Sequence, residues 1–299
     1  MSAKDLMRKL RVKLGKRVRL KNYDPAWTGG KEFGHLTKDE LKEKAAAYVQ
    51  NNLAELSAAQ DLLYASDTHS LLLVFQAMDA AGKDGTIKHV MSGVNPQGCE
   101  VHSFKQPSAE DLDHDFLWRC AKRAPERGRI GIFNRSYYEE VLVVKVHPEY
   151  LEKQKLPPGK RGRAFWQERY DDINTFERHL ARNGTVIIKF FLNVSKREQK
   201  RRFMERLDNP DKHWKFSACD MAERARWKDY MRAYEEAFRA TSTPWAPWYI
   251  IPADHKWVMR ALVSGIVTHT IKELKLKYPQ VSDEQRKQLA SARRALARE

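Results

Sequence analysis

Five short apolar runs, separated by longer amphipathic segments, constrain the fold of this chain more than any other feature. The runs are LLLVFQA (71–77), GCEVHSF (98–104), GRIGIFN (128–134), GTVIIKFFLNV (184–194) and PWYIIPA (247–253). Short runs that are apolar nearly throughout are typical of strands buried on both faces, and the helical periodicity between them is typical of crossover connections. The pattern therefore predicts an α/β fold, with a parallel sheet and covering helices.

The rest of the chain predicts helical additions to a single domain spanning 1–299. The chain has 299 residues, which is enough for one large buried core. Thr37 and Glu40 have the spacing of a capping box, which marks the start of a helix. Besides the sheet we expect a basic arm over 1–36, one helix or a broken pair from Thr37 to about Ala65, a polar helical segment over 195–240 outside the sheet core, a helix over 255–278 and a charged helix over 281–299.

The charge balance points to a polyanionic partner. Lys and Arg number 55 against 39 Asp and Glu, a formal net charge of +16. Such an excess suits nucleic acid, an anionic membrane surface or a phosphate polymer, with a solubilising surface as the plainer alternative. The sequence lacks both an apolar stretch long enough to span a membrane and the apolar core of a signal peptide, so we expect a cytoplasmic protein with no membrane partner. Cys99, Cys120 and Cys219 lie too far apart for a CxxC pair, and we expect free thiols.

Residues 71–90 predict a strand, a loop of small residues and a helix starting near Asp84. In this context backbone N–H groups and the helix N-terminus face an anion, while Lys83 reaches the β and γ oxygens of a nucleotide. The usual phosphate-loop pattern has glycine at 77 and Ser or Thr at 84, whereas this chain has Ala77 and Asp84. Asp79 favours a phosphate site over a plain strand–helix turn, because a carboxylate there implies Mg²⁺ between it and the anion. We assign phosphate contacts in this loop to Ala80, Ala81, Gly82, Asp84, Gly85 and Thr86.

A second candidate site follows the strand predicted over 128–134. Asn134 and Arg135 stand at its carboxyl end, which is the edge where ligands of open α/β sheets bind. A guanidinium can hold two phosphate oxygens at once, so Arg135 is a candidate phosphate ligand, although a surface ion pair is the alternative.

Basic side chains recur at helical spacing within 195–240. Arg202 and Arg206, four residues apart, share a helix face, as Arg197 and Arg201 do, which suits a row of phosphates. Arginines on a mobile lid fit phosphoryl transfer, where charge neutralisation supplies most of the catalysis; the alternative is an ordinary solvated helix. We assign to this lid Arg201, Arg202 and Arg206, and we expect Arg206 and Lys215 to bind phosphate. We expect the tryptophans to be core residues rather than base-stacking platforms: Trp214, Trp227, Trp245, Trp248 and Trp257.

Three strings in this order resemble the polyphosphate kinase 2 family: DAAGKDGTIKH from Asp79, IFNRSYYEEVLVVKVHPE from Ile132 and LDNPDKHWKFS from Leu207. The resemblance extends over about residues 20–275 and is strongest to the class III branch, which accepts nucleoside monophosphates as well as diphosphates. It implies a three-layer α/β/α P-loop kinase fold with a helical lid, dependence on Mg²⁺ or alternatively Mn²⁺, and a homodimer or homotetramer.

Two positions depart from other branches of the resembled family. Asn134 stands where they carry Asp before the Arg-Ser pair, which leaves Asp79 as the principal metal ligand. Glu139 stands where they carry Asn, in the acceptor nucleotide pocket. The resemblance thus implies reversible phosphoryl transfer from polyphosphate to AMP and ADP, with other purine nucleotides as an open alternative. The catalytic residues expected are Asp79, Lys83, Arg135, Arg201 and Arg202, and the nucleotide contacts are Asn134, Arg135 and Glu139.

Two rival functions are an ATP-dependent nucleotide kinase and a P-loop nucleic-acid-binding protein. An ATP-specific enzyme has less use for so much positive charge, and the sequence shows no nucleic-acid recognition module. We therefore expect inorganic polyphosphate and adenine nucleotides as partners in preference to nucleic acid.

Overall fold

The computed structural model describes residues 3–30 and 33–299, so positions 1, 2, 31 and 32 of the predicted arm lie outside it. A five-stranded sheet forms its centre, in the order β2-β3-β1-β4-β5, and all neighbouring strands are parallel. Each of the five apolar runs forms one strand, which confirms the predicted parallel sheet. The strands are β1 (Ser70–Gln76), β2 (Cys99–Ser103), β3 (Ile130–Asn134), β4 (Thr185–Asn193) and β5 (Trp248–Pro252).

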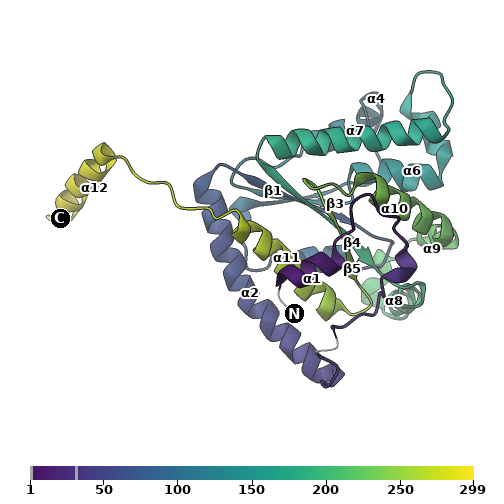
Figure 1. Cartoon of the computed structure of the whole chain (residues 1–299), viewed down its shortest axis with the longest axis horizontal. Coiled ribbons are helices and arrows are strands. Elements are labelled where there is room, and N and C mark those ends of the chain that lie inside the picture. Colours follow the sequence, from purple (N-terminus) through teal and green to yellow (C-terminus); the bar gives the residue numbers. More distant parts are fainter. Residues whose placement is uncertain (1–2, 31–32) are drawn as a thin grey trace.

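Helices cover both faces of the sheet, as Figure 1 shows. α2, α3 and α11 pack together on one face, whereas α6, α7 and α10 pack together on the other. This is the three-layer α/β/α arrangement expected. The helices are α1 (Ala3–Leu10), α2 (Lys38–Ser66), α3 (Lys83–Val90), α4 (Ala109–Asp113), α5 (Trp118–Ala121), α6 (Val143–Val146), α7 (Arg163–Arg182), α8 (Lys196–Asp208), α9 (Ala218–Ala225), α10 (Trp227–Thr241), α11 (Lys256–Glu273) and α12 (Asp283–Leu296), with short 3-10 turns that include η4 (Tyr137–Val141) and η6 (Pro210–Lys215).

The helix starts follow local capping chemistry. At α2 the hydroxyl of Thr37 accepts from the Glu40 N–H at 3.3 Å, and the Glu40 carboxylate accepts from the Thr37 N–H at 2.7 Å, so the predicted capping box is present. α3 begins at Lys83, one residue earlier than expected, because Gly82 takes a left-handed conformation (φ +105°) and forms the cap. Glycine adopts that conformation without steric cost.

The N-terminal arm lies along the edge of β5. Arg11 forms an antiparallel bridge with Tyr249, and the Val12 N–H donates to the Trp248 carbonyl at 2.9 Å. Val12 and Val18 are buried. The described part of the arm thus pairs and covers an edge that would otherwise expose unpaired backbone groups.

The expectation that all of 195–240 lies outside the sheet core is wrong for α10. Tyr234 and Phe238 of α10 pack on Phe191 of β4, with ring centroids 4.4 and 5.2 Å apart. These residues belong to an apolar stripe at helical spacing that the many charges on the same helix obscure in the sequence. The candidate lid is therefore limited to α8, η6 and α9.

The tryptophans that were predicted to be core residues differ in their burial. Trp248 is fully buried as expected, but Trp214 is 79% exposed, so its assignment to the core is wrong.

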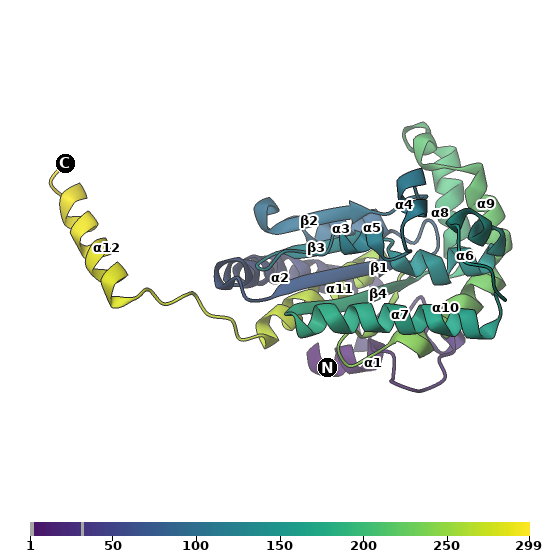
Figure 2. The same ribbon diagram turned by 90° about the horizontal axis from the view of Figure 1, so that it is seen from above.

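The predicted charged helix is α12, which stands away from the sheet at the end of an extended segment (Figure 2). All three cysteines are free thiols, as predicted. Among the described residues, none of the helices combines the length and the apolar character that crossing a bilayer requires.

Candidate active site

The phosphate loop lies between β1 and α3, at the carboxyl edge of the central strand. In the described part of the chain the backbone N–H groups of Gly82, Lys83, Asp84 and Gly85 have no acceptor. Unpaired amides at a helix N-terminus form a ready anion site, so the loop can cradle a phosphate. Thr86 differs from the expectation: its N–H and its hydroxyl both donate to the Gly82 carbonyl, at 3.0 and 2.9 Å, so it supports the helix start.

Arg202 holds the back of this loop. One of its guanidinium nitrogens donates to the carbonyls of Ala80 at 3.1 Å and Ala81 at 2.6 Å, and another donates to the Ala253 carbonyl at 2.6 Å. The C=O and N–H of a peptide point in opposite directions, so drawing the Ala81 carbonyl toward Arg202 turns the Gly82 N–H away from it. Arg202 is 5% exposed, so the expected mobile lid arginine is instead a fixed support of the loop.

Arg135 joins the loop to the end of β3. Its φ is +65°, a left-handed conformation that is uncommon for a residue other than glycine, and its N–H donates to the Phe75 carbonyl at 3.0 Å. Its side chain then reaches Asp79 at 2.9 Å and Glu139 at 3.6 Å. The adjacent Glu139 raises the pKa of Arg135, so the guanidinium remains charged. Three predicted site residues thus form one cluster: Asp79 of the loop, Arg135 directly after β3 and Glu139 of η4.

Burial sets the electrostatics of Lys83 and Glu139. The Lys83 ammonium donates to the Ala77 carbonyl at 3.2 Å. Burial lowers the pKa of Lys83, and Arg135 lowers it further, while Asp79 acts in the opposite sense. For Glu139, burial raises the pKa, and Arg135 and Lys83 counteract this effect. The desolvated cation and carboxylate therefore depend on each other and on Arg135 for their charged forms.

Asn134, the predicted nucleotide contact, lies beside the first turn of α3. Its amide nitrogen donates to the Asp84 carboxylate at 2.6 Å and to the Ser103 hydroxyl at 3.5 Å. The end of β3 is thus tied to the phosphate loop and to the end of β2. The Asp84 carboxylate points to Asn134, which leaves the backbone N–H of Asp84 as its group for an anion.

The loop after β3 is anchored by a charged cluster in the core. Lys189 of β4 donates to Glu177 of α7 at 2.6 Å, and also to the Tyr138 hydroxyl at 2.8 Å. Tyr137 also donates to Glu177, at 2.9 Å. Burial lowers the pKa of Lys189 to about 8, against the opposing effect of Glu177. Because Tyr137 and Tyr138 follow Arg135 almost directly, this cluster fixes the segment that presents Arg135.

The remaining predicted lid cations occupy two kinds of position. Arg201 is exposed (59%) and pairs with Glu198 at 2.7 Å. Arg206 donates to the Lys215 carbonyl at 3.0 Å and pairs with Asp220 at 3.4 Å, so it ties η6 and α9 to α8. Lys215 is itself exposed. Arg201 and Lys215 therefore have their charged groups in solvent, whereas Arg206 is engaged within the lid.

Two glutamines near the site were missed from the sequence. Gln199 of α8 is 1% exposed and donates to the Asp79 carbonyl at 2.9 Å. Gln76, the last residue of β1, donates to the Ser136 hydroxyl at 3.2 Å, while its side-chain oxygen has no partner among the described residues. Gln76 was recognisable in the sequence as a candidate site residue, because it is a polar residue at the carboxyl end of a buried strand. Gln199 was not recognisable, because the residues around it in the helix are polar too.

Most of the chain matches the model of one protein family. Residues 36–279, which contain the phosphate loop, β3 and the lid, match the family model described as Polyphosphate kinase 2. The chain belongs to this family. The match over these residues agrees with the resemblance of the three sequence strings.

Relatives of the polyphosphate kinase 2 family cover nearly the whole chain. An ADP-polyphosphate phosphotransferase of Rhodopseudomonas palustris is 53% identical over 86% of this chain and 89% of its own length. An AMP/ADP-polyphosphate phosphotransferase of Meiothermus ruber is 46% identical over 92% of this chain and 96% of its own. The crystal structure of polyphosphate kinase 2 from Arthrobacter aurescens TC1 superposes with a TM-score of 0.84, at 38% identity and 97% coverage of both chains.

Proposed function

We propose that this chain transfers phosphoryl groups from inorganic polyphosphate to AMP and ADP, forming ADP and ATP in reversible reactions. Membership of the polyphosphate kinase 2 family supports this, as do the relatives named for ADP or AMP/ADP and polyphosphate. The observation that carries it is the cradle of free amides at Gly82 to Gly85 beside Lys83 and Arg135. Phosphate groups are common to both substrates, and phosphoryl transfer needs positioning and charge neutralisation above all.

Each residue of the cradle has a distinct role in this proposal. Lys83 and the free amides hold the phosphate that is transferred, while Arg135 neutralises charge on its equatorial oxygens. A terminal phosphate oxygen of the acceptor attacks the terminal phosphorus of the polyphosphate. The new P–O bond forms as the bridging P–O bond breaks, and the shortened chain leaves with the electron pair. The reaction requires no covalent intermediate on the protein.

Asp79 fits a Mg²⁺ ion, with Mn²⁺ as an alternative. The described residues contain no group of three or more His, Cys, Asp or Glu that could hold a metal alone. Mg²⁺ is commonly held by one or two carboxylates, with phosphate oxygens and waters as its other ligands, and the Asp79 carboxylate is 23% exposed beside the phosphate cradle. Asp79 would hold the ion, which would supply charge neutralisation to the bound phosphates.

We also propose that Glu139 favours AMP as an acceptor, and that the chain works as a homodimer or homotetramer in the cytoplasm. The position of Glu139 at 3.6 Å from Arg135 supports the first point, because both side chains face the same cluster. The oligomer follows from the family resemblance, and its mass in solution is measurable by light scattering.

The test offers AMP or ADP to the protein with Mg²⁺ and a single donor, either polyphosphate or ATP. We expect polyphosphate to yield ADP from AMP and ATP from ADP, and chelation of the metal to stop both reactions. ADP formation from AMP with ATP but not with polyphosphate would indicate the rival nucleotide kinase. Tight RNA or DNA binding without any transfer would indicate the nucleic-acid-binding alternative.

A further inference from the structure

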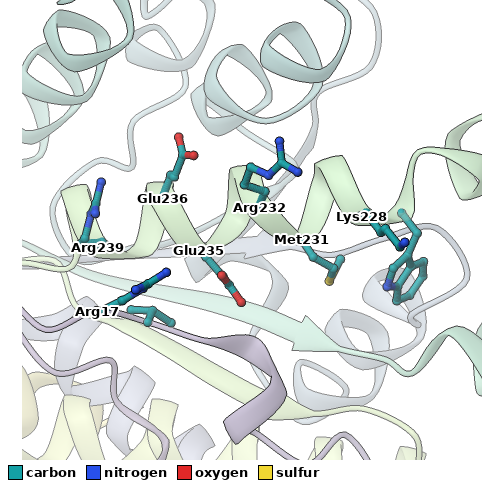
Figure 3. Close-up of a pocket in the computed structure, with 9 residues that line it drawn as sticks. Arg17, Lys228, Met231, Arg232, Glu235, Glu236 and Arg239 are labelled. Atoms are coloured by element: carbon teal, nitrogen blue, oxygen red, sulfur yellow. The ribbon is translucent and has the colours of Figure 1, made fainter. Parts of the chain in front are cut away.

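A second concave surface lies between the N-terminal arm and α10, apart from the phosphate loop. It is a pocket of about 570 Å³ (Figure 3). Lys228, Arg232 and Arg239 line it from three different turns of α10, and Arg17 lines it from the arm. We call these four residues and the space between them the arm–α10 groove.

The cationic side chains of the groove are exposed and have no paired anion among the described residues. Lys228, Arg232, Arg239 and Arg17 are all exposed. Within residues 3–30 and 33–299, none of them has an ion pair or a side-chain hydrogen bond. Elsewhere on this surface many arginines do have partners, as Arg201 has in Glu198 at 2.7 Å. Four unpaired cations around one concavity therefore favour an anionic ligand.

The carboxylates that line the same groove are already engaged. Glu235 accepts a hydrogen bond from the Leu20 N–H at 2.6 Å, which holds the arm against α10. Glu236 pairs with Lys145, which lies outside the pocket lining. Neither carboxylate is paired with a cation of the groove. The lining thus holds four cations against two carboxylates, one of which is paired with Lys145, so positive charge is in excess.

α10 separates the groove from the phosphate cluster. Successive residues of an α-helix are rotated by about 100°, so Tyr230 and Tyr234 lie on the side opposite Lys228 and Arg232. Tyr234 is buried against the sheet, with its ring centroid 4.4 Å from that of Phe191 of β4. The groove begins at the N-terminal end of α10, where Arg226 alone separates α10 from α9 of the lid. A ligand could thus pass from the cradle around this corner into the groove.

We propose that the arm–α10 groove binds the part of a long polyphosphate chain that extends beyond the transfer site. This inference rests on the proposed function. Cations from Lys228 to Arg239 follow α10 for about 16 Å, which suits a repeating linear polyanion better than a single phosphate. The groove then gives the protein a preference for long chains, because a chain that fills both sites displaces more counterions and dissociates more slowly.

The test compares two triple variants of the full chain that remove equal charge. The groove variant is R17A/R232A/R239A, and the control is K287A/R293A/R298A on the exposed α12 and the turn that follows it. Each is assayed with a long-chain polyphosphate and with the shortest polyphosphate that the wild type accepts. A donor of a few phosphates cannot reach around a helix about 10 Å across.

We expect the groove variant to raise KM for the long donor by about tenfold or more, with the short donor unaffected and the control variant unchanged for both. Equal effects on both donors, or no effect on the long donor, would overturn the proposal. A raised KM for ADP with the short donor would instead indicate a nucleotide site, and a changed mass in light scattering would indicate an interface between copies; either result overturns it. Retained short-donor activity shows that the variant folds and that the proposed function holds independently.

Discussion

At the residue scale, Arg202 connects three segments of the chain. Its guanidinium contacts the Ala81 carbonyl of the phosphate loop, the Ala253 carbonyl after β5 and Glu198 of α8. Arg202→Lys keeps the charge, but a single ammonium cannot reproduce a planar set of donors. We expect this variant to lose about 2 to 4 kcal/mol of stability in thermal or denaturant unfolding, since buried carbonyls lose their partners.

The same variant should lower kcat/KM for transfer by about tenfold, because the loop amides lose their fixed orientation. Arg201→Lys is the matched control for stability: the neighbouring Arg201 is 59% exposed, and its replacement should leave unfolding unchanged. Unfolding of Arg202→Lys that matches the wild type would contradict the role of Arg202 as a support of the loop.

Glu139 is the residue that we expect to distinguish AMP from ADP. Glu139→Asn should lower kcat/KM for AMP by at least about tenfold, roughly 1.4 kcal/mol, and lower that for ADP less. Burial raises the pKa of Glu139, so in the wild type AMP transfer should decline with acidification from a higher pH than an ordinary carboxyl would give. The variant should lack this decline. Equal losses for both acceptors would instead indicate general damage to the loop.

Residue roles were predictable from the sequence where a charged side chain that suits phosphate binding also follows a predicted strand. Asp79 and Lys83 follow the first predicted strand and Arg135 follows the third, and the family resemblance grouped them as catalytic residues. The structure brings Asp79 within 2.9 Å of Arg135. Arg202 was placed on the mobile lid because it shares a helix face with Arg206 in a basic segment, and only the fold reveals the carbonyls that surround it. Whether each of these residues takes part in catalysis stays a prediction.

At the element scale, Glu198 pairs within α8 with Arg201 and with Arg202, the residue that attaches this helix to the phosphate loop. Partial burial raises the pKa of Glu198, but hydrogen bonds and charge from Arg201 and Arg202 outweigh this and hold the pKa at about 2, below the ordinary 4.5. A carboxyl whose pKa is lower in the folded state stabilises the fold at pH above its unfolded value, and this contribution disappears as pH falls through the folded value. Wild-type Tm should therefore fall more than that of Glu198→Gln between about pH 5 and about pH 2. Parallel curves of Tm against pH for the two proteins would rule out this linkage.

Elements were predictable where one periodicity dominates. Four of the strands were recognised because buried parallel strands are apolar at nearly every position. β2 is an edge strand whose residues are partly buried or exposed, and it was recognised by its place in the alternating pattern. α10 was misplaced because its apolar stripe, which includes Tyr234 and Phe238, alternates with charged residues that now line the arm–α10 groove. A helix that faces the core on one side and a polar pocket on the other has the composition of a surface helix.

At the scale of the whole molecule, the net charge of +16 should make polyphosphate binding depend steeply on salt. Each neutralised phosphate contributes roughly 0.7 to the slope of log affinity against log salt, so four or five contacts imply a slope of about 3 in magnitude. Binding measured by fluorescence anisotropy across a salt series checks this. A flat series would show that the charge serves something other than the polyphosphate.

The central claim is that the phosphate loop transfers a phosphoryl group taken from polyphosphate. The most direct measurement is ATP formation from ADP, Mg²⁺ and polyphosphate with no ATP added, comparing the wild type with Lys83→Ala. We predict ATP with the wild type and a rate lower by about a hundredfold or more with the variant, about 3 kcal/mol of transition-state stabilisation, while circular dichroism stays unchanged. A folded Lys83→Ala protein that makes ATP at the wild-type rate would contradict the account.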